Sequence, residues 1–320
     1  MKNKIGWCDR TWNPITGCSK ISSGCKNCWA QRMSKRLAGR CGYPKDNPFA
    51  VTLHPERLNE PLKWKKPQRI FLCSMGDWMH KDVPNEFIDK ILDTITACPQ
   101  HTFLTLTKRP ENFEEKLFGE GNEYMNLWLG VSVEDQKTAD ERIPLLLATP
   151  AAKRFVSYEP ALGAVDFKKY LYHEDCDDFD CDLLACSMTS IGRGIEWIIM
   201  GGETGPGARP MHPDWARKVR DDCNEAGVSF FFKQWGEYGT KAFIMTTGEP
   251  VFRMFENFQQ WVNKGTTWIH GGVCIDKNGK ILKNGGDMKT AKYPIAIMHH
   301  VGKKAAGCLL DGKEWKELPR

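Results

Sequence analysis

The sequence predicts an α/β protein, built as a full or partial (β/α) barrel of the TIM type. Short apolar runs rich in β-branched and aromatic residues recur along the chain, and most lead through polar or glycine-rich residues into an amphipathic helical pattern. About seven such strand–helix segments fall within roughly the first 235 residues, which fits a barrel better than an open doubly wound sheet. The open sheet stays an alternative, because strand order is not encoded in a local pattern.

The predicted elements follow one another in a regular order. A first strand is expected before Cys18, and the later strands are expected at residues 69–74, 102–107, 126–132, 153–157, 196–200 and 229–232. Helical patterns are expected at residues 87–98, 108–117, 133–149 and 214–227. Residues 1–235 would therefore form the barrel. Residues 236–320 are rich in Gly, Lys, Trp and His and predict a C-terminal extension packed on it.

An acidic insertion interrupts this pattern at about residues 165–195. It carries three cysteines, Cys176, Cys181 and Cys186. Their C-x4-C-x4-C spacing matches no common zinc pattern. The interpretation as an exposed acidic insertion is therefore favoured over a second metal site.

Composition predicts a cytoplasmic protein without a membrane partner. The chain is 41% hydrophobic and 27% charged, as in ordinary globular proteins, and no apolar run approaches the roughly 18–20 residues that span a bilayer. The first residues, MKNKIGWCDR, lack the apolar stretch of a signal peptide. In a reducing compartment, 13 cysteines indicate free thiols or metal ligands in preference to a disulfide framework.

Positive charge is concentrated near the N-terminus. Residues 1–70 hold 15 Lys and Arg against 4 Asp and Glu, whereas the whole chain carries a net charge of only +5. Such a region suits a polyanionic partner such as nucleic acid. A solvated, lysine-rich surface explains the same charge, and both interpretations stay open.

Polar side chains recur where the predicted strands end, which is where barrels of this type place their active sites. The candidates are Ser74, Asp77, Lys108, Arg109, Ser132, Glu134, Glu159, Glu203, Lys233 and Gln234. Any strand must end in a polar loop, so one such residue carries little weight, and the recurrence carries more. The glycine-rich stretch GGETGPG at residues 201–207 could also present backbone N–H groups to an anion.

Three cysteines are clustered in the stretch TGCSKISSGCKNCWAQR, at Cys18, Cys25 and Cys28. A structural zinc site takes four ligands, which here would require His54 or Cys41 from a distance. A four-iron cluster held by three thiolates instead leaves one iron open to a substrate or cofactor. Glycines precede two of these cysteines and allow the backbone to turn and approach closely.

Three clustered cysteines after the first strand of a barrel resemble the radical S-adenosylmethionine (SAM) superfamily. The usual spacing there is C-x3-C-x2-C, and this chain departs from it in the first gap. From residue 11 to its end, the chain is similar to an uncharacterised family of phage and prophage proteins with radical-SAM-like barrels. The phrases that carry this similarity include TWNPITGCSKISSGCKNCWAQRM, FLCSMGDWMHKDVP, LTLTKRPENF, LWLGVSVEDQKTADERIPLLL, WIIMGGETGPGARPMHPDWARKVRDDC and AAGCLLDGKEWKELP.

This resemblance implies that Cys18, Cys25 and Cys28 bind a 4Fe–4S cluster. The open iron would bind the amino and carboxylate groups of SAM, and one electron would cleave the cofactor to a 5′-deoxyadenosyl radical. Positions that the resemblance suggests for the cofactor are Trp29 at the adenine, Ser74 to Asp77 at the methionine amino group, Lys108 or Arg109 at its carboxylate, and Ser132 and Glu134 at the ribose. Glu159, Glu203 and Lys233 are further candidates by their place at later strand ends.

The predicted partners are a nucleotide or nucleic-acid substrate and an electron donor of the flavodoxin or reductase type. Two alternatives use the same residues differently. One is a zinc-dependent hydrolase or nuclease, and the other is a non-catalytic nucleic-acid-binding protein with a structural metal. Trp29, for its part, could instead be a core tryptophan at the start of a helix.

Overall fold

The computed structural model describes residues 5–117, 124–171, 194–240 and 251–319. Two compact units divide the chain. The first comprises Met1–Ser132, Asp140–Ser157 and Tyr172–Trp197, and the second comprises Val133–Ala139, Tyr158–Leu171 and Ile198–Arg320. Most of the predicted acidic insertion, with Cys176, Cys181 and Cys186, lies outside the described residues.

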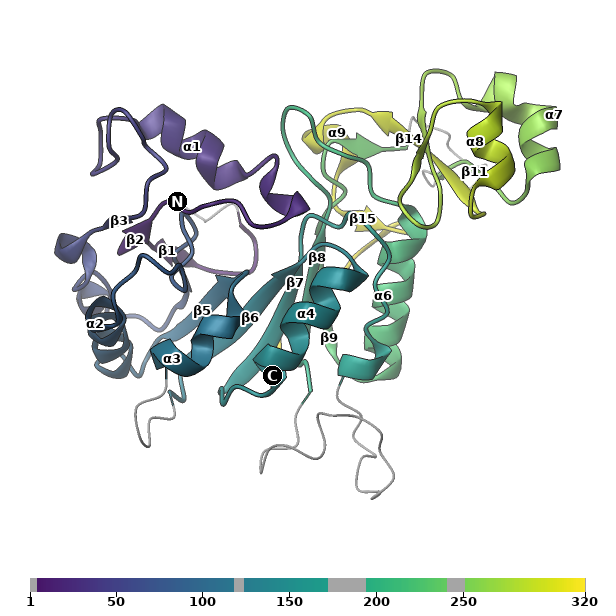
Figure 1. The fold of residues 1–320 in the computed structure, drawn as a ribbon. Helices are drawn as coiled ribbons and strands as arrows, with labels where there is room; N and C mark the ends of the chain where they lie inside the picture. The colour runs from purple at the N-terminus through teal and green to yellow at the C-terminus, as the bar shows by residue number, and fades with distance from the viewer. Residues whose placement is uncertain (1–4, 118–123, 172–193, 241–250, 320) are drawn as a thin grey trace. The chain divides into compact units, whose positions relative to one another are not determined.

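A seven-stranded sheet is the main feature of the fold, with strand order β1-β4-β5-β6-β7-β8-β9 (Figure 1). Its strands are β1 (Arg10–Trp12), β4 (Arg69–Leu72), β5 (Thr102–Thr107), β6 (Leu127–Val133), β7 (Lys153–Tyr158), β8 (Trp197–Gly201) and β9 (Ser229–Gln234). Spatial order follows sequence order, as successive βα segments with same-handed crossovers produce. The α/β prediction is confirmed, and the sheet corresponds to the partial form of the barrel.

The register of the first strands brings their carboxyl ends to one edge. Strands β1, β4, β5 and β6 pair in parallel, with Ile70 opposite Arg10 and Phe103, and Leu72 opposite Thr105. The loop that follows β4 and the last residues of β5 therefore lie next to each other. The candidates after residue 72 and around residue 107 come together for this reason.

The described helices are α1 (Trp29–Leu37), α2 (Asn85–Thr96), α3 (Phe113–Leu117), α4 (Gln136–Leu147), α6 (Pro213–Glu225), α7 (Phe258–Trp268), α8 (Gly285–Thr290) and α9 (Lys303–Ala306). The four predicted helical patterns correspond to α2, α3, α4 and α6 among them. Helix α2 buries Phe87, Ile88, Ile91, Leu92 and Ile95, the i, i+4, i+8 spacing of one apolar stripe. The apolar spacing of this stripe is what predicted the helix in the sequence, because a helix on a protein surface buries one apolar face.

The core of the first unit is rich in aromatic rings. Trp7, which precedes β1, is 2% exposed and packs edge-on against Trp197 of β8, with ring centroids 6.1 Å apart. Phe155 of β7 lies 5.6 Å from Trp197 and 6.4 Å from Trp7. Because aromatic pairs add to the free energy of simple burial, this trio ties the N-terminal segment to the sheet.

The second unit includes a smaller antiparallel sheet. Its strands are β10 (Tyr238–Gly239), β14 (Ile295–His300), β12 (Val273–Ile275) and β13 (Ile281–Leu282) in that order, with β11 (Met254–Phe255) also paired to β14. Phe255, Cys274, Ile295 and Ile297 form a buried cluster with Met288 of α8, and aromatic residues of α7 pack against it. This part of the chain thus has a hydrophobic core of its own.

The C-terminal segment pairs with the last strand of the large sheet. After the short strands β15 (Leu309–Leu310) and β16 (Lys313–Glu314), Phe232 N donates to Trp315 O at 2.8 Å and Glu317 N to Phe230 O at 3.1 Å. Strand β9 is therefore covered, which removes an exposed row of backbone donors and acceptors. Among the described helices, none combines the length and the apolar character needed to cross a membrane.

Candidate functional site

The loop with the three cysteines starts from a tightly constrained glycine. Gly17 has φ +86°, and its N–H donates to Met75 O at 2.9 Å. A Cβ at this position would lie 2.0 Å from Ala50 O. Glycine is required here both for its left-handed backbone and for this close approach, as the sequence predicted. The cysteine loop is thereby joined to the segment that follows β4.

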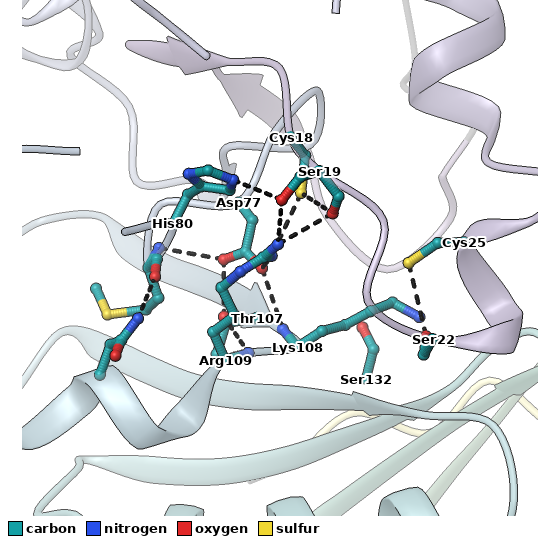
Figure 2. A network of polar contacts seen from close by, with 12 residues as sticks. Cys18, Ser19, Ser22, Cys25, Asp77, His80, Thr107, Lys108, Arg109 and Ser132 are labelled. Carbon is teal, nitrogen blue, oxygen red and sulfur yellow. Dashed lines mark hydrogen bonds and ion pairs between the residues drawn. The ribbon is translucent and has the colours of Figure 1, made fainter. Parts of the chain in front are cut away.

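Local structure positions each of the three thiols. Cys18 follows Gly17 directly, and Cys25 ends a short 3-10 turn, with its Sγ 3.6 Å from the hydroxyl of Ser22 (Figure 2). Cys28 is the N-cap of α1, and its Sγ accepts the N–H of Gln31 at 3.5 Å. All three are free, partly accessible thiols.

Asp77 is the centre of the polar network at the strand ends. Its side chain is buried, and Oδ1 accepts the hydroxyl of Thr107 at 2.7 Å and Met79 N at 3.1 Å. Oδ2 accepts Lys108 N at 3.3 Å and Arg109 Nη1 at 2.8 Å. These four contacts, several of them visible in Figure 2, satisfy the lone pairs of the carboxylate.

Arg109 joins this carboxylate to the cysteine loop. Besides Asp77, its Nη1 donates to Cys18 Sγ at 3.4 Å, and its Nη2 donates to the carbonyl and the hydroxyl oxygen of Ser19, both at 3.0 Å (Figure 2). Ser19 Oγ also lies 2.8 Å from His80 Nε2. All four N–H groups on the terminal nitrogens of Arg109 thus have partners within the protein. Through these contacts Arg109 connects the cysteine loop to Asp77, which follows β4, and so to the carboxyl ends of β4 and β5.

Charge around the thiols is uneven. Burial lowers the pKa of Lys108 to about 8, although the Cys25 and Cys28 sulfurs oppose this change. Burial alone would raise the pKa of Cys25, but the Lys108 ammonium and hydrogen bonds from Ile21 and Ser22 outweigh it, so the pKa is lowered. Burial and the Asp77 carboxylate raise the pKa of Cys18 to about 11.

The other candidates of the first unit have varied surroundings. Ser74 donates to Asn13 Oδ1 at 3.1 Å, so its hydroxyl is used to join two loops. Ser132 stands on β6 beneath Lys108 in Figure 2, and its carbonyl accepts Arg142 Nη1 at 2.6 Å. Trp29 begins α1 and is 50% exposed, so it is not a core tryptophan.

The later candidates belong to the second unit and form pairs there. Glu159 Oε2 lies 2.7 Å from Lys233 Nζ, and its Oε1 accepts Gln234 Nε2 at 3.3 Å. Glu203 binds Arg209 through both carboxylate oxygens, at 2.6 Å and 2.9 Å. Glu134 is fully buried, and its carbonyl accepts Leu162 N at 2.8 Å.

Two N–H groups of the glycine-rich stretch 201–207, and that of Arg209 just after it, are paired with other groups of the protein. Gly202 N donates to Gln234 O, Gly205 N to the Glu237 carboxylate and Arg209 N to the Glu203 carboxylate. The Glu237 and Glu203 carboxylates already accept two of the N–H groups that an external anion would need. The sequence suggested an open turn because glycines alone do not show where their N–H groups point.

The chain matches one family model over residues 2–319, that of the family described as Protein of unknown function (DUF5131). The chain belongs to this family. No curated protein and no solved structure matches it. Membership in an uncharacterised family is therefore shown, and the chemistry of this DUF5131 protein must be argued from its own residues.

Zinc ligation in this DUF5131 protein would need a fourth residue beside the three thiols. His54 Nε2 is 2.8 Å from the hydroxyl of Thr16, and its Nδ1 is 3.4 Å from Glu56, so both ring nitrogens have partners. The carbonyl of Cys41 accepts Arg57 Nη2. Within the part of the chain that the structure describes, no group of three or more His, Cys, Asp or Glu side chains converges on a point that could hold a single metal ion.

The three thiols of the cysteine loop are donors of the kind that iron–sulfur clusters use. Arg109 donates to the Cys18 sulfur, and Lys108 acts electrostatically on Cys25 and Cys28. Cations and N–H donors of this kind favour thiolates and a negatively charged cluster.

Four residues of this network were missed in the sequence. They are Thr107, which donates to the Asp77 carboxylate, Ser19, which accepts Arg109, His80, which contacts Ser19, and Asn13, which accepts Met75 N. Thr107 could have been found, because it ends the same strand whose next two residues were named. The other three are defined by contacts between distant loops, and no local pattern indicates such contacts.

Proposed function

We propose that this protein is a radical SAM enzyme whose Cys18, Cys25 and Cys28 hold a 4Fe–4S cluster. The observation that carries the proposal is the attachment of a three-thiol loop, by Arg109 and Asp77, to the carboxyl ends of β4 and β5 in a parallel sheet. Active sites of partial and full barrels lie at that edge. Three thiolates leave one iron for an external ligand.

The residues of the chain have separate tasks in this proposal. Arg109 is a positioning residue: it fixes Ser19 and donates to Cys18 Sγ, and such a hydrogen bond raises the potential of a cluster ligated there. Asp77 keeps the guanidinium oriented, since it accepts both Arg109 and the end of β5. The N–H groups on the terminal nitrogens of Arg109 are used in these contacts, so the carboxylate of SAM is assigned to a different residue.

Lys108 is the residue that we assign to the carboxylate of SAM. Its ammonium lies within electrostatic reach of Cys25 and Cys28, where the external ligand of the open iron would be held. A cation there also favours the negative charge of the thiolates. When bound, the cluster would supply the single electron that cleaves SAM.

The substrate in this proposal is a nucleotide or nucleic acid, in keeping with the resemblance to phage proteins and the positive charge of residues 1–70. An electron donor of the flavodoxin or reductase type completes the reaction. Both statements follow from analogy and from charge, and the cysteine loop supports the cofactor independently of them.

The test is anaerobic reconstitution of the full chain with iron and sulfide. We expect a brown protein with about four irons and four sulfides per chain, and release of 5′-deoxyadenosine from SAM on reduction. The variants Cys18→Ala, Cys25→Ala and Cys28→Ala should each lose the cluster. Cys98→Ala is the matched control, because Cys98 is a buried thiol after α2 and outside this network.

Two outcomes would overturn the proposal. One is a colourless protein with a single zinc bound through the same three cysteines, which would favour the zinc-dependent alternatives. The other is an intact cluster that yields no 5′-deoxyadenosine under strong reduction, which would favour a binding protein with a structural metal centre.

A further inference from the structure

The small antiparallel sheet and its helices carry a strong excess of positive charge. Residues 251–304, here called the lysine module, contain nine Lys and Arg against three Asp and Glu, a net charge of +6. The exposed lysines of the module are Lys264, Lys277, Lys280, Lys283, Lys289, Lys292, Lys303 and Lys304. The module thus holds more net charge than the whole chain does, at +5.

One buried carboxylate brings several of these lysines together. Asp276 is 3% exposed, and its side chain accepts the backbone N–H groups of Asn278, Lys280 and Lys292, at 3.0, 2.8 and 3.2 Å. In addition, Lys277 N donates to Lys292 O at 3.0 Å. The turn between β12 and β13 is therefore fastened to the segment that follows α8. Lysines from two distant stretches of chain emerge at this one place.

The acidic residues at this place do not neutralise it. The Asp276 side chain is used on the backbone, while Asp287 accepts Lys283 N at 3.0 Å and forms an ion pair with Lys280 at 2.9 Å. Within the described part of the chain, Lys277, Lys283, Lys289 and Lys292 form no ion pair. Four exposed lysines without an ion pair thus lie within residues 277–292 of the module.

We propose that this surface of the lysine module binds the phosphate backbone of nucleic acid. Closely spaced lysines release the counterions of a polyanion when they bind it, and this release drives association. A membrane surface fits less well, because interfacial binding needs an apolar face that inserts. The large apolar side chains of α7, Phe258, Trp261 and Trp268, instead pack against the internal core of the module.

The contacts should be made to phosphates and not to bases. Trp268 is the aromatic ring most closely surrounded by cations here, with Lys264 4.5 Å and Arg253 5.7 Å from its centroid. Its other neighbour is Phe255, stacked at 5.5 Å. Because the ring is covered in this way, it offers no platform for a base. We therefore expect binding that depends on salt and little on sequence.

The test measures binding of the full chain to a fluorescent DNA duplex of arbitrary sequence over a range of salt concentrations. The variant Lys283→Gln/Lys289→Gln/Lys292→Gln should weaken binding roughly tenfold or more at low salt. Each lost phosphate contact should also reduce the slope of log K against log salt by about 0.9. A duplex of different sequence should give the same result.

The matched control is Lys90→Gln/Lys137→Gln/Lys313→Gln, which removes the same charge from three exposed lysines outside both the lysine module and residues 1–70. Its binding should change by less than about twofold, since phosphate contacts act only at short range. An equal loss in both variants would show that net charge alone matters and would overturn the assignment. No binding by the unmodified chain, or equal binding of the triple variant, would do the same.

Vesicles that contain anionic lipid provide the last comparison. Tighter binding to vesicles than to DNA, lost in the triple variant, would replace nucleic acid by a membrane as the partner. The proposal does not depend on the cluster, because none of these lysines belongs to the cysteine network. Its failure would therefore leave the proposed radical SAM activity standing, and the reverse also holds.

Discussion

Two carboxylate–arginine pairs stand at strand ends of the large sheet, and they differ in what else they contact. Asp77 and Arg109 follow β4 and β5, and the guanidinium continues to Cys18 and Ser19. Glu203 and Arg209 follow β8, and this pair closes the loop in which it lies. An ion pair at the end of a strand is thus no evidence of a site by itself. Its connection to a reactive group is what distinguishes the first pair.

The pairs also differ in their contact with water. The side chains of Arg109 and Asp77 are 7% and 8% exposed, whereas Arg209 is 27% exposed beside a Glu203 that is 4% exposed. Removal of Arg109 would leave the Asp77 charge buried, whereas removal of the Glu203 charge would leave Arg209 able to reach water. The free energy of unfolding should fall much more for the first pair than for the second.

The largest effect is therefore expected from Arg109→Met. Removal of the guanidinium leaves the Asp77 carboxylate buried without its charged partner, which costs about 3–5 kcal/mol of unfolding free energy. The cysteine loop also loses its donor to Ser19, so iron content after reconstitution should fall. Urea denaturation and iron analysis measure the two effects.

A double variant distinguishes the cost of a lone buried charge from the loss of the contact between Arg109 and the cysteine loop. Asp77→Asn/Arg109→Met removes both charges, so it should be more stable than Arg109→Met alone. Iron content should stay low in both, because neither restores the contact with the loop. Full iron loading in either variant would contradict the positioning role of Arg109.

A smaller effect is expected from Glu203→Gln in the second unit. The amide keeps one acceptor for Arg209 but loses the charge, and Arg209 can turn to water. The loss should be about 1–2 kcal/mol of unfolding free energy, with iron content unchanged. Should Glu203→Gln lower iron loading as strongly as Arg109→Met does, the contrast between the two pairs would be wrong.

The smallest effect concerns acid stability. His212 is fully buried at the start of α6, where its Nδ1 accepts Asp214 N at 3.2 Å, and burial lowers its pKa. The unfolded chain therefore binds the proton first, and stability should fall as pH decreases below about 6.5. Thermal unfolding between neutral and acidic pH measures this slope.

His212→Asn is the matched variant for the pH scan. Asparagine keeps an acceptor for the first turn of α6 but does not titrate in this range. The dependence on pH should flatten in the variant, and the part that remains includes His54 and His80, whose pKa values are also lowered by burial. It also includes carboxylates such as Asp311, whose pKa would be raised by burial but is lowered overall by Arg217 and Arg220. An unchanged slope would show that His212 does not carry the acid sensitivity.

Much of the fold could be predicted because its signals are local. The strand expected at residues 102–107 is β5, and the helix expected at 87–98 is α2 with bounds two residues earlier. Both patterns reflect the spacing of the apolar residues that a strand or a helix buries against its neighbours. The small antiparallel sheet was not predicted, because most of its strands are only two or three residues long and pair with β14, which is distant from them in the sequence.

The site divides in the same way. The three cysteines and the residues at the ends of β4 and β5 were named from the sequence, since thiol spacing and strand ends are visible there. Their grouping could not be predicted. Ser74 bonds to Asn13 and Glu159 pairs with Lys233, because the partner of a side chain depends on which residues the folded chain places near it.

By itself, the sequence determined where the strands of the large sheet and the four predicted helices form, and which side chains have the chemistry to bind metal. Those properties depend on a few neighbouring residues and on elementary sterics. Only the tertiary structure decided that Arg109 holds the loop, that Gly17 lies against Ala50, that N–H groups of residues 201–207 bond to Gln234 and Glu237, and that lysines gather around Asp276. These depend on contacts between distant segments, whose free energy exists only once the chain has folded.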